Sequence, residues 1–499
     1  MFEESDDAAL VTAIGDEARA EAAAAARRLA AIAELTDRRC NSELGEQRQY
    51  WACDAFDSVA AEVAAALSIG HRAATGLLRQ ALALRHRLPK VAVLLAEGVI
   101  TARIAATLTW RTRLVDDPEV AARVDADLAA AANRFGPMSE AKLEAAVDTL
   151  IQRHDPAAVL QYQAAARGRD VGVGDPDDVT GTRSLWGRLL ITDSELLERR
   201  LEAMVRAVCP ADPRTVGERR SDAFGVITAG GDQLPCRCGK ADCPAAGSDA
   251  RASAITITVL TDQHPDPGSS ARPDPDPDPI DPGPSDPEPS GEPSATTGAS
   301  IGIIAGGGVV PTPLLAELVT MGAVVTTAPN PADCGAEPGY RPSRRLQRLV
   351  RSRDLTCRFR GCNRPAEYCD LDHTIAYASS RLTHPGNLKC LCRKHHLLKT
   401  FWVGAGGWAD RQLPDGTIEW TSPTGHQYRV PPGSRIHFPH WDTTTPTPPG
   451  SPAGPTTPAP ERGLAMPIRK YTRRQQQARA IAAERKRNQA HLDANPPPF

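Results

Sequence analysis

Residues 341–400 contain five cysteines and four histidines at spacings that metal sites use. Cys357 and Cys362 are separated by four residues, and Cys392 and His395 are separated by two. Zinc prefers four such ligands in a tetrahedron, and short pairs presented by tight turns supply them. We therefore predict that these four side chains bind a structural Zn2+. The alternative is that they are three unrelated buried thiols and a surface histidine.

A second group of polar side chains lies around these pairs. Asp372 and His373 lie between them, Asn387 comes shortly before the second pair, and His396 directly follows it. In order and spacing these residues, together with the ending from Asn387 to Thr400, resemble the HNH nuclease motif. That family folds as two strands and a helix that hold one catalytic metal ion. The resemblance implies that His373 ends the first strand, Asn387 lies in the loop or second strand, and His396 lies on the helix.

The chemistry of phosphodiester hydrolysis explains these residue types. It requires an activated water, neutralisation of the developing charge and support for the departing 3′ oxygen, and one divalent cation can provide the last two. Asp372 offers an oxygen ligand and His396 a nitrogen ligand to a cation that we expect to be Mg2+, Mn2+ or Zn2+. Neutral His373 would be the general base, and the side-chain carbonyl of Asn387 would fix its tautomer and orientation. The basic residues expected to bind flanking phosphates are Arg393, Lys394 and Lys399.

Two assignments in this region have alternatives. His395 and His396 are adjacent, so on a helix they point roughly 100° apart and cannot easily share a metal ion. In the reverse assignment, His396 would be the zinc ligand and His395 the ligand of the catalytic metal ion. Cys369 and Cys390 are expected to pack as small apolar groups, although either thiol could replace a zinc ligand.

A separate cysteine cluster comprises Cys236, Cys238 and Cys243. Three cysteines this close together can form most of a zinc site, with Cys209 or His264 as the fourth ligand. The alternative is a reduced, exposed loop. The N-terminus is acidic and has no signal-peptide core, so thiols or metal ligands are favoured over disulfides.

Stretches along the chain also resemble an actinobacterial family, the thirteen-E-twelve repeat proteins. That family joins a long N-terminal helical domain of unknown function to a C-terminal HNH module. The resemblance covers roughly residues 25 to 440 and is most specific in the C-terminal third. It implies a nuclease encoded near mobile or repeated DNA. The matching stretches are Ala305–Pro311, Pro338–Ser343, Arg353–Trp402, Asp410–Thr417 and Trp420–His426. The last two are expected as β-hairpins, and Asp212–Ala223 resembles the end of the helical domain.

The elements that position these residues are mostly helical before residue 230. Apolar periodicity predicts helices near 16–35, 55–67 and 68–84, the last capped by Ser68. Two short helices at 91–98 and 101–108 would form a helix-turn-helix or an ordinary helical hairpin. Strands near 184–192 and 254–260 flank a helix at 193–208, which indicates a small α+β element.

The predicted fold class is multidomain: a mainly α-helical N-terminal domain with a small α+β element, and a C-terminal zinc-stabilised ββα-metal (HNH) module. Asp-Pro repeats cannot bury enough apolar surface to fold, so they mark a linker. The expected divisions are a helical domain of unknown function (1–262), an acidic Pro-rich disordered linker (263–299), a connecting segment (300–340), the HNH module (341–402), a β-hairpin extension (403–440), and a disordered Pro/Thr-rich stretch with a basic tail (441–499).

The formal net charge is −3, from 58 basic and 61 acidic side chains, and such a balance is unusual for a nucleic-acid-binding protein. The local charges are opposed, however. Residues 262–298 carry nine acidic side chains and one arginine, whereas residues 341–400 carry fourteen Arg or Lys and four Asp or Glu, a net of +10. We therefore expect DNA as the partner of the C-terminal module. The basic tail would lie along phosphates or form a solvated helix.

The function predicted from these features is that of a metal-dependent HNH endonuclease hydrolysing DNA phosphodiester bonds. A zinc-stabilised DNA-binding protein of mobile-element origin without cleavage activity is the alternative, and a scaffold for protein interactions is a third. No segment has the pattern of a membrane span, so we expect a cytoplasmic protein with no membrane partner and no small-molecule cofactor. A homo-oligomer is compatible with the sequence.

Overall fold

The structure, a computed structural model, describes residues 6–159, 170–177, 182–251, 256–260, 301–304, 309–310, 315, 319, 324–439, 441–445 and 465–494. The linker expected at 263–299 and the Pro/Thr-rich residues 446–464 lie outside the described residues. The described part is mainly helical with small sheets, as predicted. None of its helices is both long and apolar enough to cross a membrane.

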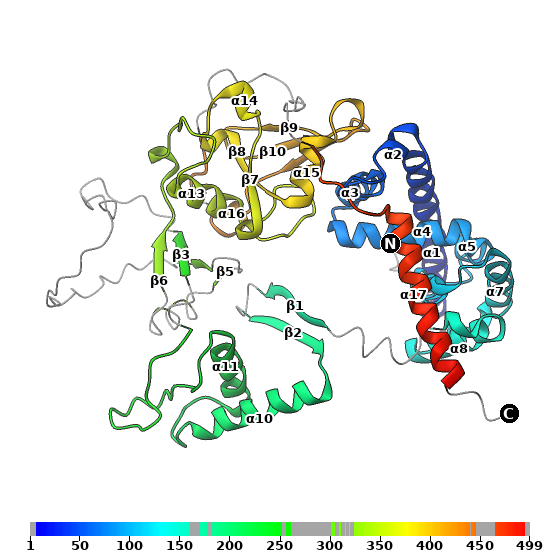
Figure 1. Ribbon diagram of the computed structural model, residues 1–499, viewed down its shortest axis with the longest axis horizontal. Coiled ribbons are helices and arrows are strands. Elements are labelled where there is room, and N and C mark those ends of the chain that lie inside the picture. Colours follow the sequence, from blue (N-terminus) through cyan, green and yellow to red (C-terminus); the bar gives the residue numbers. More distant parts are fainter. Residues whose placement is uncertain are drawn as a thin grey trace.

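The N-terminal part is a helical bundle (Figure 1). Alanine, which has the highest helix propensity, fills much of its first and third helices, and apolar side chains from most of the bundle share one buried core. The elements are α1 (Asp7–Cys40), α2 (Glu43–Gln47), α3 (Ala55–Leu67), α4 (His71–His86), α5 (Pro89–Ala96), α6 (Ala102–Arg111), η1 (Thr112–Leu114), α7 (Pro118–Ala130), η2 (Ala132–Arg134), α8 (Glu140–His154) and η3 (Pro156–Ala158).

Side-chain caps set several helix boundaries in the bundle. Thr101 accepts a hydrogen bond from the backbone N–H of Ile104 and begins α6, as expected of an N-cap residue. The prediction that Ser68 begins a helix was wrong. Ser68 adopts the left-handed conformation (φ 54°) that ends α3, and α4 begins at His71. Helices α5 and α6, the segment considered as a helix-turn-helix, both contribute buried side chains to the bundle core.

Two smaller parts follow the bundle in the chain. β1 (Asp170–Asp177) pairs antiparallel with β2 (Thr182–Arg188), and α10 (Ile191–Ala207) packs against α11 (Val216–Thr228). A four-stranded sheet has the order β5-β4-β3-β6, in which β3 and β6 are parallel and the other neighbours antiparallel. Its strands are β3 (Thr256–Leu260), β4 (Ile301–Ile304), β5 (Val309–Val310) and β6 (Val324–Thr327).

The C-terminal module is built on two antiparallel strands followed directly by a helix (Figure 1). β7 (Cys369–His373) pairs with β8 (Leu388–Cys392), and α15 (Arg393–Phe401) continues from β8. A three-stranded antiparallel sheet, β11-β10-β9, lies where β-hairpins were predicted. The other elements are η5 (Pro331–Asp333), α13 (Arg344–Asp354), η6 (Ala366–Tyr368), α14 (Tyr377–Ser380), η7 (Pro385–Asn387), η8 (Gly404–Gly406), β9 (Ala409–Gln412), β10 (Ile418–Thr421), β11 (Gln427–Val430) and α16 (Ser434–His437).

A second buried core joins this module to the helical bundle. Ala61 and Ala65 of α3 share it with Leu398 and Trp402 of the module. The indole N–H of Trp402 also donates a 2.9 Å hydrogen bond to the backbone carbonyl of Cys53, just before α3. The bundle and the module are therefore in direct contact through apolar packing.

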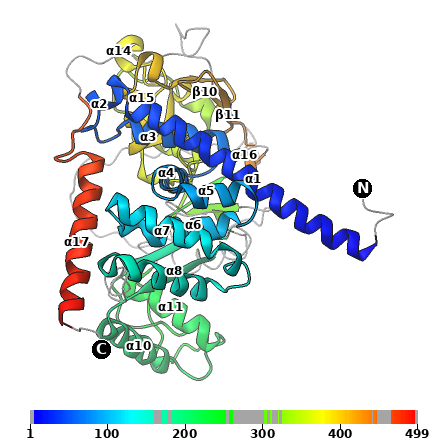
Figure 2. The same ribbon diagram turned by 90° about the vertical axis from the view of Figure 1, so that its right-hand side faces the viewer.

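The basic tail returns to the N-terminal bundle. Helix α17 (Arg473–Ala494) lies alongside it in both views (Figures 1 and 2). Arg485 forms a 2.6 Å ion pair with Asp155, and the side-chain amide of Asn488 donates to the carbonyl of Ala157 at 2.9 Å. The alternative of a solvated helix therefore needs correction, because the helix packs on the bundle through these contacts. Phosphate binding by the other basic residues of the tail stays a prediction.

Candidate metal centre and catalytic site

The four predicted zinc ligands come together in the C-terminal module. One ligand atom from each of Cys357, Cys362, Cys392 and His395 lies within 4.8 Å of all the others. Nδ1 of His395 is 3.5 Å from Sγ of Cys357 and 3.3 Å from Sγ of Cys392. The cluster could bind a metal ion such as zinc.

The turn between the first two cysteines is shaped by its glycine and its aromatic residue. Gly361 has φ +76°, and a Cβ there would meet the backbone oxygen of Ile69 at 2.5 Å, so this position favours glycine. Phe359 stacks on the ring of His395 with 4.0 Å between centroids. Packing of the bundle against this turn thus helps to fix the ligands.

Both open assignments are resolved by position. His395 belongs to the cysteine cluster, whereas His396 faces the carboxylates of Asp370 and Asp372. Cys369 and Cys390 are buried, and the described four-residue cluster includes neither of them.

A carboxylate and an imidazole meet where β7 ends and α15 begins. Nε2 of His396 is 3.5 Å from Oδ1 of Asp372, and its Nδ1 is 2.9 Å from Oδ2 of Asp370. Two ligands that are each about 2.1 Å from one ion lie about 3 to 3.4 Å apart, so Asp372 and His396 fit a shared divalent cation. Asp370 would then orient the imidazole from its other nitrogen.

His373, the last residue of β7, has the properties of a general base. Burial lowers its pKa to about 4, so the ring is neutral near pH 7. Its Nε2 lies 3.0 Å from the hydroxyl of Thr383, which donates its single proton to the carbonyl of Gly339. We therefore assign the ring proton to Nε2, which leaves the lone pair on Nδ1. Tyr340 stacks on the ring at 5.4 Å.

Asn387 acts on the loop after β7, and the prediction that its carbonyl orients His373 needs correction. Its Oδ1 accepts a 2.7 Å hydrogen bond from the backbone N–H of Ile375, and its Nδ2 donates to the carbonyls of Ile375 and Leu382. The asparagine therefore closes the loop between the strands. Thr383 holds the ring of His373 instead.

Two of the three predicted phosphate-binding residues form ion pairs with carboxylates of the chain. Lys399 is 3% exposed, and its Nζ lies 2.6 Å from Oδ2 of Asp372. Lys394 donates a 2.9 Å hydrogen bond to Asp57 of α3. The prediction for Lys399 therefore needs correction, since its buried ammonium group neutralises Asp372. The Lys394 side chain stays 42% exposed, so phosphate contact by Lys394 remains a prediction. Arg393 keeps an exposed side chain (67%), with a 3.3 Å contact to Asp370.

A buried charge network supports Asp372. Oδ2 of Asp372 lies 2.6 Å from Nζ of Lys389 as well as from Lys399, and Lys389 also pairs with Asp410 at 2.6 Å. Burial alone would raise the pKa of Asp372, but the two lysines and His396 hold it below its ordinary value. Lys389 and Asp410 were not predicted as site residues. The signal for Lys389 was a lysine within the apolar strand β8, whereas no sequence signal marked Asp410.

A cavity of about 300 Å3 opens beside these residues. Its lining includes Asp372, His373, Arg393 and His396, and also Pro467 from the segment before α17. The candidate base, the carboxylate–imidazole pair and one exposed arginine therefore share a single concave site, as expected for an active site.

The second predicted cysteine cluster also assembles. One sulfur from each of Cys209, Cys236, Cys238 and Cys243 lies within 4.8 Å of the others. Cys209 is the fourth residue of this cluster among the described residues, and His264, the other candidate, lies outside them. This cluster, like the first, could bind a metal ion such as zinc.

Two uncharacterised proteins of Mycobacterium tuberculosis are similar to this chain over almost its whole length. "Uncharacterized protein Rv2100" of Mycobacterium tuberculosis strain H37Rv is 50% identical over 506 residues, which cover 99% of this chain and 90% of that protein. "Uncharacterized protein Rv3776" of the same strain is 49% identical over 501 residues, 99% of this chain and 92% of its own length. No solved structure matches.

A family model described as "Domain of unknown function (DUF222)" matches residues 16–354. The match begins in α1, extends beyond the linker expected at 263–299, and ends with the last residue of α13. It covers more than half of the chain and stops before β7, β8 and α15. The chain therefore belongs to the DUF222 family.

Proposed function

We propose that the chain is a metal-dependent endonuclease whose C-terminal module hydrolyses DNA phosphodiester bonds by HNH-type chemistry. The observation that carries this proposal is the 3.5 Å approach of Asp372 and His396 in the cavity that His373 also lines. The order of the elements supports it, because His373 ends β7 and His396 lies on the helix that follows β8.

Each residue would have one task in the reaction. A cation held by Asp372 and His396 would neutralise the scissile phosphate and stabilise the departing 3′ oxygen. Nδ1 of His373 would accept the proton of the attacking water, while Thr383 keeps the ring in the required tautomer. Arg393, exposed at the rim, would pair with a flanking phosphate. The products would carry a 5′ phosphate and a 3′ hydroxyl.

We also propose that the cluster of Cys357, Cys362, Cys392 and His395 binds zinc. Soft thiolate and imidazole donors in a four-ligand set suit this ion. The ion would link the turn before β7 to the junction of β8 and α15. Because His396 directly follows the zinc ligand His395, this link would also fix the position of His396 beside Asp372.

The test is plasmid nicking with Mg2+, Mn2+ or Zn2+, comparing the unmodified protein with His373→Ala. Loss of a general base should slow cleavage about 10²- to 10⁴-fold. His86→Ala, which alters a half-exposed histidine paired with Asp37 on the bundle surface, is the matched control and should cleave normally. Equal cleavage with and without His373, or none by either protein on supercoiled, linear and single-stranded DNA, would remove the nuclease proposal.

One observation favours the alternative of DNA binding without cleavage. Two ammonium groups already contact Oδ2 of Asp372, and such positive charge opposes a divalent cation at the same carboxylate. This alternative predicts salt-sensitive DNA binding that His373→Ala leaves unchanged, with no nicking in any metal. Gel-shift titrations at several salt concentrations, run beside the nicking assay, separate the two functions.

A further inference from the structure

The α10–α11 hairpin has too small a core for its size. Six described side chains are buried together there: Leu201, Met204, Val208, Ala223, Val226 and Leu234. Small units of this kind usually need a disulfide or a metal ion to stay folded. Cys209 lies just after α10, and the other three cysteines lie in the loop after α11.

The sulfur positions suit a tetrathiolate metal site. All four sulfurs lie within 4.8 Å of one another, and those of Cys209 and Cys236 are 3.3 Å apart. Four sulfurs at about 2.3 Å from one zinc ion are separated by about 3.8 Å, whereas a disulfide requires about 2.05 Å. The cluster is therefore closer to a metal site than to a pair of disulfides.

The backbone around the cysteines provides an independent observation. Backbone hydrogen bonds close the loop around the cysteines: the N–H of Cys236 donates to the carbonyl of Ala245 at 2.9 Å, and the N–H of Cys243 donates to the carbonyl of Lys240 at 3.2 Å. Tight turns of this kind present cysteine pairs to a zinc ion. Gly239, inside one of these turns, has φ +73°, a conformation that favours glycine.

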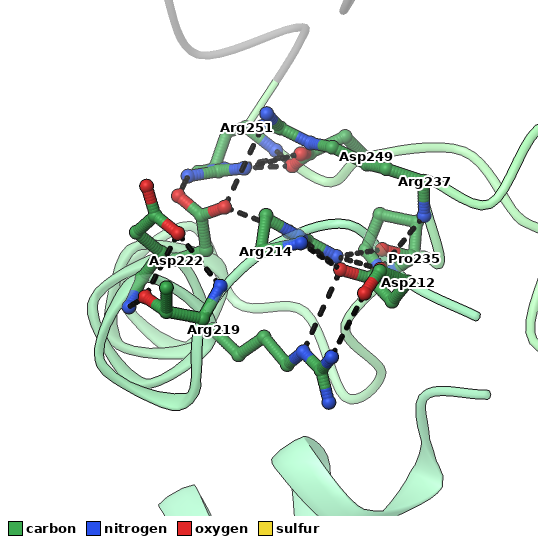
Figure 3. Close-up of polar contacts among 10 residues, drawn as sticks. Asp212, Arg214, Arg219, Asp222, Pro235, Arg237, Asp249 and Arg251 are labelled. Carbon is green, nitrogen blue, oxygen red and sulfur yellow. Dashed lines mark hydrogen bonds and ion pairs between the residues drawn. The ribbon is translucent and has the colours of Figure 1, made fainter. Parts of the chain in front are cut away.

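An ionic network holds the two cysteine-bearing segments together without using the cysteines (Figure 3). The guanidinium of Arg214 contacts Asp212 at 2.8 Å and Asp222 at 2.7 Å, and it donates to the carbonyl of Pro235 at 2.8 Å. Asp212 also accepts a 2.9 Å hydrogen bond from the backbone N–H of Arg237. The residues flanking Cys209 and Cys236 are thus fixed side by side, which lowers the entropic cost of assembling four ligands.

We propose that Cys209, Cys236, Cys238 and Cys243 bind one structural Zn2+ ion. The ion would join the end of α10 to the loop after α11 and stabilise the hairpin. The four thiol donors select zinc over Mg2+ or Ca2+, which prefer oxygen ligands. This site is separate from the candidate catalytic site, and it stands or falls independently of the nuclease proposal.

Zinc content of the full chain tests the proposal. Protein purified with zinc and a reductant is analysed by mass spectrometry for bound metal, and Cys238→Ser should contain one zinc ion fewer than the unmodified chain. Cys334→Ser, a buried cysteine outside both clusters, is the control and should retain all the zinc. An unchanged zinc content in Cys238→Ser would overturn the proposal.

Alkylation of the unmodified protein gives a second readout that needs no substitution. With zinc bound, the four thiols should resist N-ethylmaleimide together, and they should become reactive after a chelator removes the metal. Free reactivity before chelation would overturn the proposal. So would a Cys209–Cys236 or Cys238–Cys243 disulfide in protein kept under reductant, detected by peptide mass spectrometry.

Discussion

Replacing Lys399 by methionine should destabilise the C-terminal module strongly. Two lysines and two aspartates form the buried network: Nζ of Lys399 lies 2.6 Å from Asp372 and 3.6 Å from Asp410, and Lys389 pairs with both carboxylates. The four formal charges cancel. Methionine keeps much of the side-chain volume but leaves one negative charge uncompensated in the interior.

The size of the effect follows from burial. Lys399 is 3% exposed, and Lys389 and Asp410 are fully buried, so solvent screens the charges little. Removing one partner of a buried ion pair costs about 3–5 kcal/mol, a large part of the roughly 5–15 kcal/mol that stabilises a domain. With an m-value of about 2 kcal/mol per M, the urea midpoint should fall by about 1.5–2.5 M.

Tryptophan fluorescence during urea unfolding can measure this change, because Trp402, Trp408 and Trp420 are all buried in the module. Arg393→Met, on the same helix but largely exposed, is the control and should change stability by less than about 0.5 kcal/mol. Adding Asp410→Asn to Lys399→Met restores charge balance and should recover part of the loss. A midpoint for Lys399→Met that matches the control would refute the account of the network.

Three further predictions concern other carboxylates. Burial alone would raise the pKa of Asp354, but Arg353 and Arg358 hold it below its ordinary value. The stability that the ionised Asp354 contributes is therefore complete above about pH 4 and is lost as the pH falls further. The stability deficit of Asp354→Asn in urea should shrink between pH 7 and pH 3, and a constant deficit would contradict this. Asp57→Asn removes a carboxylate that pairs with Lys394, with Arg469 and with Arg473, the first residue of α17. Backbone hydrogen exchange should therefore accelerate in α3 and α15. Unchanged exchange would show that apolar packing alone holds the bundle to the module. If the proposed nuclease function is correct, Asp370→Asn should lower metal affinity or nicking about 10- to 100-fold. Nicking should recover at higher metal concentration. A metal dependence equal to that of the unmodified protein would show that Asp370 does not orient His396.

Local spacing explains why both cysteine clusters could be predicted. Cys357 and Cys362 belong to one turn, and His395 follows Cys392 within the first turn of α15, so short-range geometry brings each pair together. The resemblance to the HNH motif implied that His373 ends a strand, and it is the last residue of β7. For the second cluster, Cys209 was one of two candidates for the fourth ligand. It is too far in sequence from Cys236 for local geometry to bring the two side chains together.

Tertiary packing decided the residues that the sequence misassigned. Asp410 lies in β9, and its pairing with Lys389 depends on how the three-stranded sheet packs on the module. Lys394 reaches a partner on α3, 337 positions earlier in the chain. A lysine in a basic segment looks the same in sequence whether it faces solvent or a buried carboxylate, so phosphate contact was the wrong prediction for the buried Lys399.

The basic excess of residues 341–400 must be reinterpreted in this light. Four of its fourteen cations are buried and paired inside the module: Arg353, Arg358, Lys389 and Lys399. Two of its four acidic residues, Asp354 and Asp372, are buried with them, so the remaining side chains carry ten positive and two negative charges, a net of +8. The positive surface therefore persists after the internal pairs are removed. Because Arg393 lines the candidate cavity and is largely exposed, a polyanion drawn to this surface would meet the arginine beside His396 and Asp372, the pair that carries the proposed chemistry.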